Sequence, residues 1–389
     1  MIPRLIQREL SQSRSEYPVI CITGPRQSGK TTLARSAFPD HAYVSFEDPL
    51  IRDIFKEDPK GFLFNYDNGA VFDEAQHVPD LFSYLQIMVD ENSTAGRFVI
   101  TGSQHFGLTE SISQSLAGRA AILELLPFTA SELRTGGWLS SFVNQAIWHG
   151  GYPPVFDRGL RPEKWYANYM STYIQRDVRH ISQIQNLDTF TRFMRLCAGS
   201  CGQIVNTNRI GGECGVDNKT ISRWLTVLQA SYIIQLLPSY HRNFRKRVIK
   251  TPKIYFHDTG LACHLLGINH PNQLTHHPLR GAIFENWVFS ELAKGQFNQG
   301  RTLGLFFWRT HGGQEVDFIL EQDGKTHLIE VKSGMTIAPS AIRKFEKTVE
   351  LWPGENTGCS MVYGGTDSIK VKSTSILPWD KIDQLIHPS

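Results

Sequence analysis

The sequence predicts an α/β protein whose first part is a parallel β-sheet with helices on both faces. One reason is the octet Gly-Pro-Arg-Gln-Ser-Gly-Lys-Thr at residues 24–31, which follows an apolar run at 19–22 and precedes a helix-compatible stretch at 31–37. A second reason is the series of short apolar runs at 42–46, 70–72 and 98–101, the last two of which end in polar residues. A third observation, the pair of apolar runs at 315–320 and 328–332 around a turn, adds a second sheet later in the chain.

The octet matches the phosphate-binding pattern G-x-x-x-x-G-K-[ST] in the strand–loop–helix setting that this chemistry needs. Gly24 and Gly29 allow backbone N–H groups to turn inward around a β-phosphate, and the start of the next helix adds positive potential. Lys30 is expected to contact the β- and γ-phosphates, and the Thr31 hydroxyl to coordinate Mg²⁺. The alternative is a chance glycine-rich turn before a helix. The pattern predicts a nucleoside triphosphate site formed by Gly24, Pro25, Arg26, Gln27, Ser28, Gly29, Lys30, Thr31 and Thr32.

Acidic and polar residues follow two of the predicted strands. The run at 70–72 ends in Asp73 and Glu74, about 43 residues after Lys30 with one predicted strand between. Asp73 is placed to hold Mg²⁺ through a water, and Glu74 to orient and deprotonate the attacking water. The run at 98–101 leads to Ser103 and Gln104, either of which would sense or align that water. The alternative for these two is an ordinary strand-to-helix turn.

This progression of strands resembles the AAA+ branch of P-loop ATPases, in which Ser103 or Gln104 would occupy the first sensor position. Arg119 ends the helix-like stretch 111–118, just before a predicted strand at 120–126. The resemblance implies that Arg119 is an arginine finger acting on the γ-phosphate of a neighbouring subunit, and therefore that the protein forms a homo-oligomer. The alternative for Arg119 is a surface or salt-bridged arginine.

Several short sequence words together resemble one broad prokaryotic family of AAA-type ATPases with a C-terminal half of unassigned function. They are Gly-Pro-Arg-Gln-x-Gly-Lys-Thr, Asp-Glu-x-Gln, Thr-Gly-Ser and Leu-Ala-Gly-Arg, and the segments 149–153 and 173–177 resemble the linker of that family. The resemblance spans nearly the whole chain and implies ATP and Mg²⁺ as cofactors.

Bulk composition is that of an ordinary globular protein. Apolar residues make up 41%, charged residues 20%, and the net charge is +3. No apolar run approaches the roughly 20 residues that cross a bilayer, and the N-terminus lacks a signal-peptide core. The six cysteines fit no common zinc pattern, so free thiols in a reducing compartment are expected. We expect a cytoplasmic protein without membrane contact.

The middle of the chain has the pattern of a winged helix. Helices are expected at 190–199, 204–212 and 218–230, the third with Asp217 as N-cap, followed by strands at 232–238 and 253–256. Asn218, Lys219, Ser222 and Arg223 form the outer side of the third helix. The segment 241–253 between the strands carries Arg242, Arg245, Lys246, Arg247, Lys250 and Lys253 without an acidic residue. The pattern predicts DNA in contact with the third helix and this basic segment. The alternative is a packing or dimerisation module with a solvated basic surface.

A second possible site lies in the last third of the chain. An amphipathic helix at 281–293 contains Glu285, and the two strands joined at Asp323-Gly324 carry Asp317, Glu330 and Lys332. This set resembles the PD-(D/E)xK nuclease superfamily, which implies Mg²⁺ held by Glu285, Asp317 and Glu330, with Lys332 stabilising charge. The alternative is a retained scaffold with a salt-bridged Glu330–Lys332 pair that serves packing or partner binding.

We therefore expect three domains: a P-loop AAA+ core at 1–140, linker helices and a winged helix at 141–265, and a nuclease-like α/β domain at 266–389. Two functional classes remain open. One is an ATPase that acts on or with DNA, and the other is an ATP-dependent switch whose nuclease-like domain is catalytically silent.

Overall fold

A computed structural model describes residues 2–103, 115–173, 186–240, 251–310, 312–352, 354 and 358–386. Gln104, the first half of the expected helix 111–118, residues 174–177 and the basic residues between 242 and 250 lie outside this range. The chain divides into two compact units. The first takes its residues from Met1–Phe128, Ala230–Tyr232 and Phe297–Thr302, and the second from Thr129–Gln229, Ile233–Gln296 and Leu303–Ser389.

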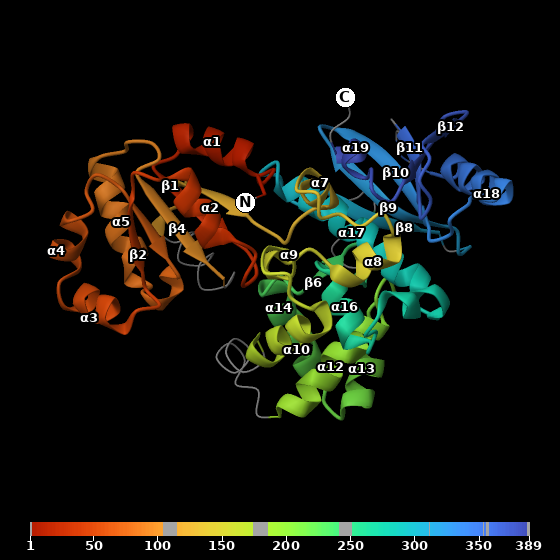
Figure 1. Ribbon diagram of the computed structural model, residues 1–389, viewed down its shortest axis with the longest axis horizontal. Coiled ribbons are helices and arrows are strands. Elements are labelled where there is room, and N and C mark those ends of the chain that lie inside the picture. Colours follow the sequence, from red (N-terminus) through yellow and green to blue (C-terminus); the bar gives the residue numbers. More distant parts are fainter. Residues whose placement is uncertain are drawn as a thin grey trace. The chain divides into compact units, whose positions relative to one another are not determined.

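The first unit contains the expected parallel sheet (Figure 1). Its strands are β1 (Val19–Thr23), β2 (Ala42–Ser45), β3 (Ala70–Asp73), β4 (Phe98–Gly102) and β5 (Ala120–Glu124). Their order in the sheet is β2-β3-β4-β1-β5, and every neighbouring pair is parallel. The strand β4 thus separates β1, which leads into the glycine-rich loop, from the acidic strand β3. All their C-terminal ends meet at one edge of the sheet.

Helices cover both faces of this sheet because the central strands are apolar on both sides. The helices of the first unit are α1 (Gln7–Glu16), α2 (Lys30–Ala37), α3 (Pro49–Glu57), α4 (Pro59–Phe64) and α5 (Asp80–Glu91), with a short 3₁₀ helix η1 (Ala75–His77). Along β1, Ile20 and Ile22 pack with the apolar residues of α1 and α2. Val19 and Cys21 face the other way, toward α3, α4 and α5. This alternation in a fully buried strand confirms the predicted three-layer core.

The second unit begins with helices. They are α7 (Ala130–Thr135), α8 (Val143–His149), α9 (Pro153–Asp157), α10 (Pro162–Tyr173), α12 (Leu187–Gly199), α13 (Thr207–Cys214) and α14 (Asn218–Ala230). The antiparallel strands β6 (Ile234–Leu237) and β7 (Lys253–Phe256) follow α14. Asp217 accepts a hydrogen bond from the backbone N–H of Thr220 at 2.7 Å, as expected of an N-cap. The predicted order of three helices and two strands is therefore confirmed.

The same unit continues into a six-stranded mixed sheet. The helices of this part are α16 (Thr259–Leu265), η3 (Pro271–His276), α17 (Arg280–Phe297), α18 (Pro339–Glu350) and α19 (Asp383–Ile386). The strands of the sheet are β8 (Leu305–Arg309), β9 (Glu315–Gln322), β10 (Lys325–Lys332), β11 (Gly358–Tyr363), β12 (Ile369–Val371) and β13 (Thr374–Pro378). The sheet order is β12-β13-β11-β10-β9-β8. Strands β8, β9 and β10 are antiparallel, and β11 joins β10 in parallel after α18. Asp323 and Gly324 form the predicted two-residue turn with φ values of 52° and 74°.

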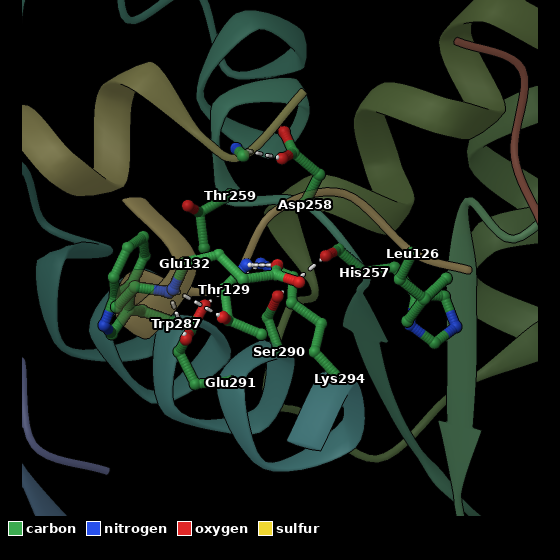
Figure 2. Close-up of polar contacts among 12 residues, drawn as sticks. Leu126, Thr129, Glu132, His257, Asp258, Thr259, Trp287, Ser290, Glu291 and Lys294 are labelled. Atoms are coloured by element: carbon green, nitrogen blue, oxygen red, sulfur yellow. Dashed lines mark hydrogen bonds and ion pairs between the residues drawn. The ribbon is translucent and has the colours of Figure 1, made fainter. Parts of the chain in front are cut away.

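Helix α17 anchors the second unit through a buried polar network (Figure 2). The Glu291 carboxylate accepts the backbone N–H of Ala130, at the start of α7, at 2.7 Å, and Lys294 donates to its other oxygen at 3.0 Å. The Ser290 hydroxyl donates to the carbonyl of His257 at 2.7 Å. Burial raises the pKa of Glu291, and the neighbouring ammonium opposes that rise. Residues of both predicted C-terminal domains thus belong to one compact unit, and the predicted boundaries at 140 and 265 stay a prediction.

The segment His-Gly-Gly-Tyr-Pro at 149–153 has a structural role in this unit. The Asp258 carboxylate accepts the backbone N–H of Gly151 at 2.8 Å and the Tyr166 hydroxyl at 2.7 Å, and it also caps α16. Gly150 has a φ of 66°, and a Cβ atom there would lie 2.6 Å from an oxygen of Asp258. Only glycine fits at this position without moving two buried side chains.

We expect Gly150→Ala to destabilise the protein by about 3 kcal/mol or more, because a left-handed backbone costs an alanine about 1–2 kcal/mol and the new methyl group overlaps Asp258 and Tyr166. The matched control is Gly159→Ala, since Gly159 also has a positive φ, 57°, but nothing lies within 4 Å of its Cβ position. Denaturant unfolding would measure both. Equal losses of stability would show that the close approach is unimportant.

Candidate functional site

The glycine-rich loop connects β1 to α2 in a strained path. Gly24 and Gly29 have φ values of 145° and 98°, and Gln27 between them is also left-handed at 61°. A side chain at Gly24 would overlap the carbonyl oxygen of Leu125, which follows β5. The buried Arg4 supports the loop, because its guanidinium donates to the carbonyls of Ser28 at 2.9 Å and Leu126 at 2.6 Å. The loop therefore has the backbone form that the motif predicts.

Lys30 is the first residue of α2, and its ammonium group lies over the loop. It donates to the carbonyls of Gly24 at 3.1 Å and Pro25 at 2.8 Å, and the residue is only 6% exposed. A buried ammonium group needs acceptors, and here the loop supplies them. The ammonium group is thus held against the loop carbonyls, in a position to bind an anion in the loop.

Asp73, at the end of β3, is the acceptor of three hydroxyl groups. Thr31 donates to its two oxygens at 3.0 and 3.1 Å, Tyr43 donates at 2.7 Å, and Thr101 makes a short hydrogen bond. Burial, followed by the hydrogen bond to Asp73, raises the pKa of Tyr43 to about 12. The sequence analysis predicted that Thr31 and Asp73 serve one metal. Tyr43 and Thr101 were not predicted, because their only signal is a polar side chain within a short strand.

These side chains fit a magnesium ion by their chemistry. A threonine hydroxyl and a carboxylate are hard oxygen ligands, which Mg²⁺ prefers, and Thr31 and Asp73 already touch. Neither softer sulfur nor imidazole groups are part of the set. Thr31 and Asp73 are therefore the residues that would hold Mg²⁺ beside the loop.

Glu74 follows Asp73 with a left-handed backbone, φ 55°. Its carboxylate accepts a short hydrogen bond from the amide of Gln76 and a longer one, 3.3 Å, from the Ser103 hydroxyl beyond β4. An unusual backbone angle at a non-glycine residue is typical of functional positions. Glu74 and Ser103 are thus brought together as predicted, and Gln76 of the Asp-Glu-x-Gln word orients the same carboxylate.

Arg119 lies at the opposite edge of the sheet. Its carbonyl pairs with the N–H of Val19, the first residue of β1, whereas the loop follows the last residue of that strand. Its guanidinium makes a two-bonded ion pair with Asp90, at 2.5 and 3.0 Å, and this pairing raises the Arg119 pKa. The side chain therefore does not join the loop of its own chain.

Glu124 is a partly buried carboxyl group near the loop, and the sequence patterns did not indicate it. It ends β5 and pairs in register with Thr23, the last residue of β1. The Thr23 hydroxyl also bonds to the hydroxyl of Tyr232 at 2.9 Å. Burial raises the pKa of Glu124 to about 7, so its charge changes near neutral pH.

The carboxylates predicted for a nuclease-like site lie on the expected elements of the second unit. Glu285 is on α17, Asp317 on β9, and Glu330 with Lys332 on β10. Burial, followed by repulsion from Asp317, raises the pKa values of Glu285 and Glu330 to about 7. Within the described part of the chain, however, no group of three or more His, Cys, Asp or Glu side chains could hold a metal ion.

Lys253 corrects one prediction about the basic segment 241–253. The segment was predicted to contact DNA phosphates, with a solvated basic surface as the alternative, because it contains no acidic residue. Instead Lys253 is 5% exposed and forms ion pairs with Glu285 at 3.2 Å and, more closely, with Glu315. The two carboxylates come from elements 30 or more residues later in the chain, so no local signal revealed them.

The outer face of α14 is exposed as predicted. Ile221, Leu225 and Leu228 are buried, whereas the polar residues on the other side, Asn218, Lys219, Ser222 and Arg223, face solvent.

Across the described residues, no helix is both long enough and apolar enough to span a membrane.

Comparison with known proteins agrees with the geometry of the first unit. Residues 16–134 match the family model of an AAA domain, whereas residues 141–272 and 280–382 match two domains of unknown function, DUF8612 and DUF4143. Among solved structures, the Walker-type ATPase PABY2304 of Pyrococcus abyssi is 14% identical, with 67% of this chain and 94% of that chain covered and a TM-score of 0.46.

The parallel sheet, the glycine-rich loop and the AAA match define this protein as one with a P-loop ATPase domain of the AAA type. Two mycobacterial sequences are 30% identical to it over 378 residues: the uncharacterized proteins Rv2008c of Mycobacterium tuberculosis and Mb2031c of Mycobacterium bovis. The alignments cover 96% of this chain and 82% of each relative. The chain belongs to the family of these two proteins.

Proposed function

We propose that this protein binds and hydrolyses ATP with Mg²⁺ in the first unit. The observation that carries the proposal is the meeting of Thr31, Asp73 and Glu74 beside the Lys30 loop at one edge of the parallel sheet. Mg²⁺ bound there would polarise the phosphates of the nucleotide. Lys30 would exchange its loop carbonyls for the β- and γ-phosphates.

In this proposal Glu74 accepts the proton of the attacking water. Ser103 and Gln76 hold its carboxylate in place by donating to it, so that the water meets the base in one orientation. Gln104 remains an alternative for the sensing role. The test is ATP turnover by the full chain, which should require Mg²⁺, stop with EDTA and return with added Mg²⁺. A folded chain that neither binds nor hydrolyses ATP would overturn the proposal.

We propose Arg119 as a finger that acts on a neighbouring copy of the chain. Its position at the far edge of the sheet supports a role in trans, because it does not join its own loop. It would have to leave Asp90 to act. Homo-oligomerisation is therefore part of this proposal, and ATP turnover per chain should rise with protein concentration.

A second candidate function is DNA binding by the second unit. It is favoured by the order of three helices, α12 to α14, followed by the strands β6 and β7. The exposed polar face of α14, the third of these helices, carries Lys219 and Arg223 one turn apart. The order helix, three antiparallel strands, helix and parallel strand from α17 to β11 also supports a nuclease-like fold. An ATP-dependent switch without DNA is the alternative, and DNA stimulation of ATP turnover separates the two.

We expect the double charge reversal Lys219→Glu/Arg223→Glu to weaken duplex DNA binding by about tenfold or more and to reduce the slope of log K against log salt by up to about 2. The matched control is Arg343→Glu/Lys347→Glu, an exposed pair with the same spacing on α18. Fluorescence anisotropy at several salt concentrations would measure both. Equal effects of the two pairs, or no DNA binding by the wild type at low salt, would leave α14 a packing helix.

A further inference from the structure

The nuclease resemblance implies a divalent metal held by Glu285, Asp317 and Glu330, but the side chains do not fit one. Each carboxylate has an oxygen committed to a donor of the protein. Glu285 accepts from Lys253 and Tyr255 on one oxygen, Asp317 accepts the backbone N–H of Val331 at 2.8 Å, and Glu330 accepts Lys332 at 2.6 Å. Among the residues that the structure describes, these carboxylates do not form a group of three side chains that could hold a metal ion.

The cation at this place is the ammonium group of Lys253. It lies 3.2 Å from an oxygen of Glu285 and closer to one of Glu315, and it also lies 5.4 Å from the centre of the Phe307 ring. Its side chain is 6% exposed, whereas that of Lys332 is 40% exposed. Attraction to Glu285, Glu315 and Asp317 raises the pKa of Lys253 against the opposing effect of burial. The lysine is therefore charged and enclosed by acidic groups.

The backbone holds Lys253 in this position. It is the first residue of β7 and pairs with Leu237 of β6, and Tyr255 two residues later points to the same carboxylate. Asn286, next to Glu285 on α17, accepts the N–H and donates to the carbonyl of Phe256 at 2.6 and 2.8 Å. These bonds tie β7 to α17, so the ammonium cannot leave without breaking a buried network.

We propose that Lys253 is the resident cation of this carboxylate cluster and takes the electrostatic place that a divalent metal has in a metal-dependent nuclease. A fixed ammonium offsets part of the negative charge of the carboxylates and repels a second cation at the same oxygens. These carboxylates then bind no divalent metal and cleave no phosphodiester bond through one. This inference does not depend on the ATPase activity proposed for the first unit.

The test is Mn²⁺ binding to the nucleotide-free full chain, measured by electron paramagnetic resonance. Every protein carries Asp73→Asn, so that the loop of the first unit contributes no metal site. Lys253→Gln removes the charge but keeps a donor for Glu285, and Lys253→Arg keeps the charge. The parent and Lys253→Arg should show no saturable binding below roughly 1 mM, and Lys253→Gln should bind one Mn²⁺ at least about tenfold more tightly. Adding Glu285→Gln should abolish that binding.

Three results would overturn the proposal. One is saturable binding of Mn²⁺ by the parent that Glu285→Gln or Glu330→Gln removes, because the cluster would then be a native metal site. Another is a folded Lys253→Gln that binds no better than the parent. The last is a Lys253→Gln that does not fold and that Mn²⁺ does not restore, because the lysine would then have a role that no metal can take. Folding of this variant only with Mn²⁺ would support the proposal.

Discussion

Replacing Lys30 by alanine is expected to weaken ATP binding by about tenfold or more and to lower turnover by about two to three orders of magnitude. The substitution removes the lysine ammonium group that the loop motif directs at the β- and γ-phosphates. The substitution also removes the two hydrogen bonds from the ammonium group to the carbonyls of Gly24 and Pro25, but the strand β1 and the Arg4 contacts that support the loop remain. Nucleotide titration and steady-state turnover would measure the two effects.

Two further proteins make the result for Lys30 specific. Lys56→Ala removes an exposed lysine from α3 of the same unit and should behave as the wild type. Lys30→Arg keeps the charge in a different shape, so a large loss there would show that the point charge and its reach both matter. Unchanged affinity and turnover in a folded Lys30→Ala protein would disprove the assignment of the loop.

The substitution Glu74→Gln is expected to separate binding from hydrolysis. The amide has the same size and still accepts hydrogen bonds from Gln76 and Ser103, but it cannot take a proton from water. Turnover should fall by about two to four orders of magnitude while ATP affinity stays within about twofold of the wild type. Single-turnover assays with labelled ATP, together with equilibrium binding, would measure the two quantities.

The control for Glu74 is Glu57→Gln, which changes an exposed carboxylate at the end of α3. It should leave both affinity and turnover unchanged. Wild-type turnover in Glu74→Gln would show that another group is the general base. A loss of ATP affinity as large as the loss of turnover would show that Glu74 contributes to binding.

Much of the fold could be predicted because its signals are local. The five parallel strands, the helix α14 with its N-cap Asp217 and the turn at Asp323-Gly324 lie where the sequence places them. Apolar periodicity, capping residues and turn residues each act over only a few positions, so they can be recognised without the rest of the chain. The same holds for the loop at 24–31, whose chemistry lies in one continuous segment.

The pairing of distant polar side chains could not be predicted in the same way. Tyr43 and Thr101 reach Asp73 from β2 and β4, and nothing near Asp73 in the sequence names them. Gly150 belongs to a recognisable sequence motif, but a glycine is required there because Asp258, more than 100 residues later in the chain, approaches its backbone closely. Such contacts depend on strand order and on which helix covers which segment.

By itself, the sequence determined the class of the first unit, the position of its glycine-rich loop and the two acidic residues at the end of β3, because each depends on short patterns with a known geometry. Only the tertiary structure decided the partners of the charges. Lys253 belongs to a run of basic residues without a local countercharge, yet the fold buries it between Glu285 and Glu315. Electrostatic energy falls with distance through space and takes no account of separation along the chain, so a lysine's role depends on the carboxylates that folding brings within a few ångströms.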